Sequence, residues 1–181
     1  MFRFLFGRRF LLALAVLFLV SPQGGTAMAQ GPQLLILTLE SGDVTIQLRP
    51  DLAPQHVDQI VRLADQGFYD GVVWHRVIPG FMAQTGDPTG TGRGGSHLPD
   101  LRAEFTDQAS FGRGTIGMAR TSDPNSANSQ FFICFQDCSF LDGEYTIWGQ
   151  VTDGMELIDQ LNPGEPPANP SVIVRMRSAY E

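Results

Sequence analysis

The sequence predicts a mainly β protein, in which about eight short strands form a sandwich or a closed barrel, accompanied by two short helices. Short apolar and β-branched runs recur along the chain with turn residues between them, and the 20 glycines indicate many tight turns. Only two segments have the apolar spacing of an amphipathic helix, one after the second strand and one before the last. Helices at these positions would cap the two open ends of a barrel.

The first two strands are predicted at residues 34–40 and 43–49. In the second of them, Val44, Ile46 and Leu48 alternate with polar residues, which is the pattern of a half-buried strand. The short length of both segments and the Ser-Gly pair between them favour a direct hairpin connection.

The first helix is predicted to begin at Pro54, a residue that suits the first helical turn, and to end at Gly67. A second helix is predicted after Asp153, which with Glu156 resembles a capping box, and it should stop at Asn162-Pro163. Residues 86–114 are predicted to form one long, Gly-rich surface loop system. The remaining strands are predicted around residues 73–77, 81–85, 115–119, 129–135, 145–151 and 172–177.

Residues 1–29 are predicted to be a signal peptide. Three arginines precede an unbroken apolar run from Phe10 to Val20, and small residues follow at Ala27 and Ala29. We expect cleavage after Ala29, export to the periplasm and a mature domain of residues 30–181, with no membrane attachment after cleavage. An uncleaved anchor is the alternative. The paired arginines leave the twin-arginine route open, although the strong hydrophobicity favours general secretion.

Composition and spacing argue against several kinds of partner. The net charge of −7 argues against nucleic acid, which requires a basic surface. Residues 90–95 match the dinucleotide-binding pattern G-x-G-x-x-G, but no helix is predicted to follow them. The three histidines are scattered over different segments without the spacing of metal ligands. We therefore expect no cofactor and no metal.

The two cysteines, Cys134 and Cys138, are expected to be free, buried thiols. Four residues of extended chain cover about 13 Å, whereas bridged cysteines need Cα atoms within about 7 Å of each other. An oxidising compartment keeps a disulfide open as the alternative, provided that the chain turns sharply after Cys134.

The candidate site lies in three blocks: WHRVIPGFMAQTGD at 74–87, SQFFI at 129–133 and FLDGEYTIWGQV at 140–151. Together they provide one arginine near a Pro-Gly break, amide side chains and large apolar side chains, but no nucleophile, acid–base pair or metal cluster. Such a site can hold a ring and polarise an amide, and it is poorly equipped to break a covalent bond. Strand periodicity puts Gln130 and Phe132 on one face, opposite Phe131 and Ile133.

These blocks, together with GTIGMAR at 114–120, resemble the signature blocks of cyclophilins, the cyclosporin-binding peptidyl-prolyl isomerases. The resemblance covers residues 34–178. It implies a closed, eight-stranded antiparallel barrel capped by two helices, and cofactor-free cis/trans isomerisation of X-Pro bonds. Arg76 corresponds to the catalytic arginine. The resemblance implies that the substrate-binding residues are Phe81, Met82, Gln84, Ala119, Arg120, Thr121, Gln130, Phe132, Phe140, Leu141 and Tyr145.

The chemistry of these side chains agrees with that activity. An X-Pro bond isomerises slowly because amide resonance opposes rotation, with a barrier of about 18–20 kcal/mol. In the twisted state the imide nitrogen regains a lone pair, and the permanently charged Arg76 is a donor that could stabilise it selectively. The apolar side chains, namely Phe81, Met82, Phe132 and Leu141, would hold the proline ring.

Three positions depart from the best-known eukaryotic cyclophilins. Phe140 stands where they have tryptophan, Tyr145 where they have histidine, and Arg120 where they have asparagine. Losing the indole donor should weaken cyclosporin binding without affecting isomerisation. Arg120 adds a second cation near the groove, which should favour acidic residues beside the proline.

The sequence therefore predicts a periplasmic prolyl isomerase that assists the folding of exported proteins. Its substrates would be proline-containing polypeptides, and the enzyme would act as a monomer. The alternative is a non-catalytic module that binds proline peptides on the same fold.

Overall fold

The structure, a computed structural model, describes residues 33–179, so the predicted signal peptide lies outside the described residues. This part of the chain contains eight strands, two α-helices and one 3-10 helix. In chain order the elements are β1 (Leu34–Leu39), β2 (Gly42–Leu48), α1 (Pro54–Asp65), β3 (Arg76–Ile78), β4 (Met82–Thr85), β5 (Thr115–Met118), β6 (Phe131–Cys134), η1 (Ser139–Leu141), β7 (Ile147–Asp153), α2 (Met155–Ile158) and β8 (Ile173–Ala179).

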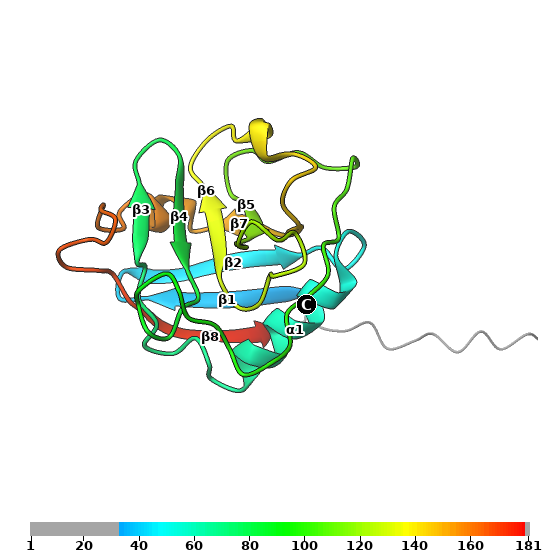
Figure 1. Ribbon diagram of the computed structural model, residues 1–181. Helices are drawn as coiled ribbons and strands as arrows, with labels where there is room; N and C mark the ends of the chain where they lie inside the picture. Colours follow the sequence, from blue (N-terminus) through cyan, green and yellow to red (C-terminus); the bar gives the residue numbers. More distant parts are fainter. Residues whose placement is uncertain (1–32, 180–181) are drawn as a thin grey trace, which may run out of the picture.

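All eight strands belong to one antiparallel sheet in the order β3-β4-β6-β5-β7-β2-β1-β8. In Figure 1, β3, β4 and β6 stand upright while β2, β1 and β8 run across beneath them, so the sheet curls round its own core. The helix α1 packs against β8 and β7, and α2 packs against β2. Each predicted strand has a counterpart, and residues 86–114 form a long loop system as expected. No helix in residues 33–179 is long and apolar enough to cross a membrane.

The prediction of a closed barrel is wrong, because β3 and β8 at the two ends of the sheet order form no ladder with each other. Instead, the segments that adjoin these two strands form backbone hydrogen bonds across the gap. The N–H of Trp74 donates to the carbonyl oxygen of Ser171 over 2.9 Å, and Val77 and Gly164 exchange two bonds of 2.8 and 2.9 Å. The physical reason is that β3 has only three residues, and the loop before β8 enters the space beside it.

The first helix begins and ends as predicted. Pro54 occupies its first turn, where the missing N–H is no loss. After the C-cap at Gln66 the chain turns at Gly67, whose φ of +77° lies in the left-handed region that favours glycine. The buried face of α1 contains Ile60 and Leu63, which join the core of the protein.

The predicted capping box of the second helix is wrong. Asp153 is still the last residue of β7, and α2 is a single turn. Its N-cap residue is Gly154, with a φ of +81°, and a Cβ there would lie 2.7 Å from the carbonyl oxygen of Asp43. The chain must turn sharply as it leaves β7 against β2, and a left-handed glycine makes that turn.

The buried apolar residues form two separate clusters. The inner cluster lies between the sheet and α1 and includes Leu37, Ile46, Ile60, Trp74, Phe131, Ile133 and Trp148. The outer cluster consists of Leu52, Met82, Phe111, Phe132, Cys134, Cys138 and Ile147, with Phe81, Leu141 and Tyr145 partly buried against it.

Strand β6 contributes to both clusters, as its period of two residues predicts. Phe131 and Ile133 point into the inner cluster, while Phe132 and Cys134 belong to the outer one. The ring of Phe131 makes edge contacts with Trp74 and Trp148, at centroid distances of 6.2 and 5.4 Å. Both tryptophans are fully buried, so they serve as packing residues.

Both cysteines are free and buried, as predicted, although the reasoning from an extended spacing was wrong. Strand β6 ends at Cys134 and the chain then turns, so that Cys138 returns to the same cluster. Burial raises the pKa of both thiols, and each thiol group contacts the other.

Candidate active site

Arg76 and Gln84 lie opposite each other on the hairpin of β3 and β4. The turn between these strands includes Gly80 with a φ of +72°, which accounts for the Pro-Gly break in the sequence. The side chain of Arg76 is 40% exposed, so its guanidinium group remains accessible to a ligand. The hairpin therefore presents a fixed cation and an amide side by side.

A chain of amide contacts extends from Gln84 into the neighbouring loop. Its Nε2 donates to Oε1 of Gln130 over 2.9 Å. Gln130 in turn donates to the carbonyl oxygens of Gly92 and Gly94, over 3.1 and 2.8 Å. Both amides are thereby oriented before any substrate arrives, which is the property expected of groups that position a peptide.

The Gly-rich loop itself is organised by the buried carboxylate of Asp87. This group accepts hydrogen bonds from the backbone N–H of Thr89, Thr91 and Arg93, over 2.8, 3.0 and 3.1 Å. Burial alone would raise the pKa of Asp87, but hydrogen bonds from Thr89 and from the backbone of Gly94 and Gly92 outweigh it and hold the pKa well below the usual range. The dinucleotide-like pattern is therefore a loop wrapped around a carboxylate of the protein itself.

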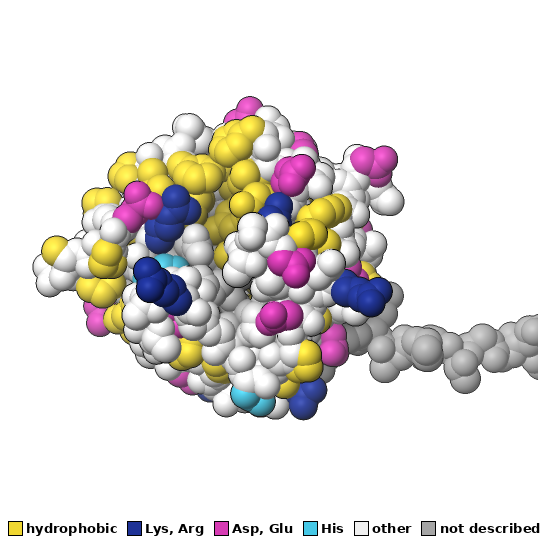
Figure 2. All heavy atoms as spheres, in the orientation of Figure 1, with side chains coloured by type: hydrophobic (Ala, Val, Ile, Leu, Met, Phe, Trp, Pro, Cys, Tyr) yellow, Lys and Arg dark blue, Asp and Glu magenta, His cyan; other side chains and the backbone are white. Residues whose placement is uncertain are grey.

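The apolar part of the site is the open side of the outer cluster. Met82 and Phe132 form its floor, with only 1% and 4% of their surfaces exposed, and Phe81 and Leu141 stand partly exposed around them. The ring of Phe111 stacks behind Phe132 at a centroid distance of 5.5 Å. Figure 2 shows apolar side chains gathered over the upper ends of β4 and β6, with a basic group at their edge.

Two further predicted residues frame this surface. Phe140, in η1, is 69% exposed and its ring lies 5.6 Å from that of Phe81. Tyr145 packs edge-on against Phe132 at 5.5 Å. The aromatic rim of the site therefore comes from the segment after β6, as the third sequence block predicts.

The segment from Ala119 to Thr121 lines a hollow of about 530 Å³ beside the amides. Arg120 lies here, but its guanidinium group already contacts other groups of the protein. Its guanidinium donates to the carbonyl oxygens of Glu144 and Thr121, both over 3.0 Å, and stacks 4.7 Å above the ring of Tyr145. The expected preference for acidic substrates has no support from this arrangement, in which Arg120 ties two loops together.

The structure brings all of the predicted site residues together around the β3–β4 hairpin and the outer cluster. Sequence reasoning missed several others. Arg93 and Asn128 also line the hollow, Phe111 supports the floor, and Glu165 accepts a hydrogen bond from Nε of Arg76 over 2.5 Å. Arg93 lies within the Gly-rich pattern of residues 90–95, which was considered only as a nucleotide site, and the other three residues lie outside the three blocks, although the apolar character of Phe111 indicates burial.

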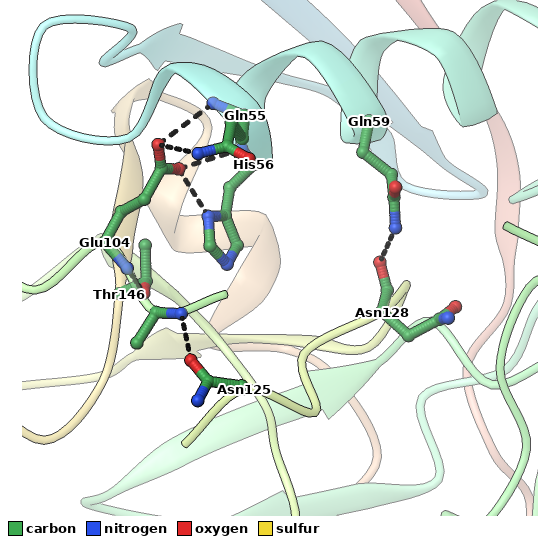
Figure 3. Close-up of polar contacts among 8 residues, drawn as sticks. Gln55, His56, Gln59, Glu104, Asn125, Asn128 and Thr146 are labelled. Carbon is green, nitrogen blue, oxygen red and sulfur yellow. Dashed lines mark hydrogen bonds and ion pairs between the residues drawn. The ribbon is translucent and has the colours of Figure 1, made fainter. Parts of the chain in front are cut away.

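A second polar cluster lies at the start of α1, apart from the groove. Figure 3 shows Glu104 facing the first turn of this helix, where one carboxylate oxygen contacts Nδ1 of His56 at 2.6 Å. Glu104 also accepts from the backbone N–H of Gln55 and His56, over 3.2 and 3.1 Å. The backbone N–H of Glu104 donates to Thr146 Oγ1, so the carboxylate joins the loop to the helix and the backbone joins it to the segment before β7.

Comparison with known proteins places this geometry in a family. Residues 34–180 match the family model for cyclophilin type peptidyl-prolyl cis-trans isomerases. A probable peptidyl-prolyl cis-trans isomerase of Brucella suis is 52% identical over 159 residues, which cover 81% of each protein. A peptidyl-prolyl cis-trans isomerase-like 1 protein of Aspergillus oryzae is 39% identical over 148 residues, covering 77% of this chain and 91% of that protein.

Solved structures agree with the sequence relatives. The cyclophilin AquaCyp293 of Hirschia baltica matches with a TM-score of 0.75 and 30% identity, covering 81% of this chain and 74% of its own. A cyclophilin type isomerase of Cryptosporidium parvum, crystallised in the presence of the dipeptide Ala-Pro, matches with a TM-score of 0.77 and 28% identity, covering 82% of this chain and 100% of its own. The chain therefore belongs to the cyclophilin-type peptidyl-prolyl cis-trans isomerases and is an enzyme of the isomerase class.

Proposed function

We propose that Arg76 is the catalytic residue of this isomerase, and that proline-containing polypeptides on their way through the periplasm are its substrates. The observation that carries the proposal is the position of Arg76 at the edge of the apolar floor of Met82 and Phe132, directly opposite Gln84. A proline ring lying on that floor would bring its imide nitrogen within reach of the guanidinium group.

The proposed mechanism needs no bond to be made or broken. Resonance keeps the X-Pro bond planar, and rotation through the twisted state makes the imide nitrogen pyramidal and basic. The guanidinium group of Arg76 donates to that nitrogen and so stabilises the twisted state more than either planar state. Arginine keeps its proton throughout, so it acts as a donor and never as a base.

One hydrogen bond is too weak to carry the whole effect. A charged hydrogen bond contributes about 1.5–3 kcal/mol, whereas an acceleration of about 10⁴-fold requires about 5.5 kcal/mol. The floor of Met82 and Phe132 supplies the rest by holding the ring while the preceding carbonyl rotates. Gln84 and Gln130 would hold the substrate backbone, because both amides are already oriented.

Two observations support the choice of substrate and compartment. The Cryptosporidium parvum relative was crystallised in the presence of Ala-Pro, which favours proline-containing substrates for this chain as well. The N-terminal sequence has the features of a secretory signal. We propose a monomeric enzyme, without a cofactor, that assists the folding of exported proteins. The first residue of the enzyme recovered from a periplasmic extract, expected to be Gln30, tests the export.

The catalytic assignment is tested by exchange NMR on a short X-Pro peptide with the wild type and Arg76→Ala. We expect turnover to fall by at least about tenfold, a loss of about 1.4 kcal/mol. The free energy of unfolding should stay within about 1 kcal/mol of the wild type, as is usual for an exposed side chain. Wild-type turnover in the variant would remove Arg76 from the mechanism.

A further inference from the structure

We propose that Glu165 is a positioning residue for Arg76, which holds the guanidinium group through its Nε–H and leaves the terminal N–H groups for the substrate. This inference rests on the proposed catalytic role of Arg76. The contact itself is short, with Nε of Arg76 2.5 Å from Oε1 of Glu165. An ion pair between half-exposed side chains generally contributes little to stability, so its significance depends on how it is built.

The backbone places Glu165 beside Arg76. Val77 and Gly164 exchange two antiparallel hydrogen bonds of 2.8 and 2.9 Å. Arg76 precedes Val77 and Glu165 follows Gly164, and in an antiparallel pair these two neighbours lie across from each other. The pairing of the two backbone segments therefore brings the carboxylate of Glu165 close to Arg76.

The turn that presents Glu165 is tightly constrained. Gly164 has a φ of +147°, which favours glycine, and a Cβ there would lie 2.5 Å from the Cα of Pro167. An isolated bridge also joins Gly164 and Pro167. The segment that carries Glu165 is thus folded back on itself and docked on β3, so the backbone from which its side chain projects is fixed.

Glu165 also faces the same open space as the catalytic group. Glu165, Arg76 and Gln84 line one hollow of about 250 Å³, together with His75 and Thr91. The carboxylate therefore stands at the site, where it can act on the donor, and not on the far side of β3.

The chemistry of arginine explains what the contact would achieve. The guanidinium group is planar, and an acceptor at Nε restrains the rotation of that plane. The two terminal nitrogens keep their donors in a fixed direction, so less rotamer freedom is lost when the twisted imide forms. A positioning role predicts a lower kcat with an unchanged KM when the contact is removed, because the donor acts in the transition state.

The test compares Glu165→Ala with Glu165→Gln, which removes the charge but keeps an oxygen that accepts from Nε–H. For the alanine variant we expect kcat to fall by about fivefold, which corresponds to about 1 kcal/mol at 1.36 kcal/mol per factor of ten. The glutamine variant should recover to within about twofold of the wild type. Unchanged or faster turnover in Glu165→Ala, or equal impairment of both variants, would overturn the proposal.

The matched control is Asp159→Ala. Asp159 pairs with Arg113 over 2.6 Å, and the exposed fractions of 49% and 40% are similar to the 40% and 53% of Arg76 and Glu165. This variant should keep wild-type kcat and KM, which separates the loss of a site contact from the loss of any surface ion pair.

The decisive measurement adds Glu165→Ala to the Arg76→Ala variant. A residue that acts only through Arg76 has nothing to position once that side chain is removed, so residual turnover should not fall further. A further fivefold fall would show an independent role and overturn the proposal. Full activity in Arg76→Ala alone would overturn the proposed function, whereas loss there with full activity in Glu165→Ala would overturn only this inference.

Discussion

The inner and outer clusters are made of the same kinds of residue, yet one is a core and the other is the wall of a site. Strand β6 supplies both, with Phe131 facing inward and Phe132 outward. The inner cluster is covered by α1 and by the strands around it. The outer cluster is covered by loops and by η1, and it remains open where Phe81, Phe140 and Leu141 reach the surface. The comparison shows that the elements covering an apolar cluster, and not its amino-acid composition, decide whether it serves as a core or as the wall of a site.

If this comparison is sound, substitutions in the inner cluster should affect stability more than activity. Phe131→Ala removes a fully buried ring that contacts Tyr69, Trp74 and Trp148, so we expect the free energy of unfolding to fall by about 3–5 kcal/mol. Urea unfolding measures the loss, and turnover per folded molecule should change far less. Lost turnover with unchanged stability would break the distinction between the clusters.

A complementary change probes the outer cluster through Gly117. A Cβ at this position would lie 2.6 Å from atoms of both Phe132, which forms part of the floor, and Phe111, which stacks behind it. For Gly117→Ala we expect about 1–3 kcal/mol of destabilisation from overpacking, with a clear loss of turnover because the floor is displaced. Gly112→Ala is the control, since its Cβ would meet nothing within 4 Å. Full activity in Gly117→Ala would mean that the floor tolerates displacement.

A lower pH tests the buried part of the molecule, because the pKa values of two buried histidines are shifted there. Burial lowers the pKa of His56, although the Glu104 carboxylate opposes this shift. Burial also lowers the pKa of His75; there the Asp87 carboxylate opposes the shift and the charge of Arg76 adds to it. Below about pH 6.5 the unfolded chain therefore binds protons that the folded chain does not. Stability should be constant above that pH and fall below it, by at most about 1.4 kcal/mol per pH unit for each group. Urea unfolding between pH 7.5 and 5.5 checks this, and a stability that rises on acidification would contradict it.

The smallest expected effect concerns the exposed rim. Phe140→Trp keeps an aromatic ring beside Phe81 and adds an indole N–H donor. A neutral hydrogen bond contributes about 0.5–1.5 kcal/mol, so cyclosporin should bind about two- to twelvefold more tightly. Turnover of a small peptide should hardly change, because the proposed ring-binding floor is untouched. Inhibitor titration of both proteins decides the matter, and equal inhibition constants would place Phe140 outside the binding groove.

The fold could be predicted from sequence wherever a local pattern determined the structure. The period of two residues in β6 correctly separated Phe131 from Phe132, and Pro54 and Gly67 correctly marked the ends of α1. The start of α2 was missed because Gly154 turns against β2, a neighbour from a distant part of the sequence. The closed barrel was wrong because pairing across the gap depends on the path of the loop before β8.

The candidate site shows the same limit. The residue blocks around Arg76, Phe132 and Leu141 were identified by their resemblance to a family, and the structure brings them together. Glu165 lies 89 residues from Arg76 in an irregular segment, so no local pattern could connect the two. Arg120 looked like a free cation, and only the positions of Glu144 and Tyr145 reveal that its charge is already engaged.

The gap between β3 and β8 has a consequence for solubility. An open sheet has two edges whose unpaired N–H and C=O groups can recruit strands from other molecules and start aggregation. Here the segment around Gly164 covers β3, and Trp74 pairs with Ser171 ahead of β8. The loop before β8 therefore covers the edge of β3, while the segment after α1 covers β8 through bonds of Asp70, Gly71 and Val72 to Met176 and Ile173. Shortening the loop before β8 would be expected to expose the edge of β3 and to let molecules associate through backbone hydrogen bonds at that edge.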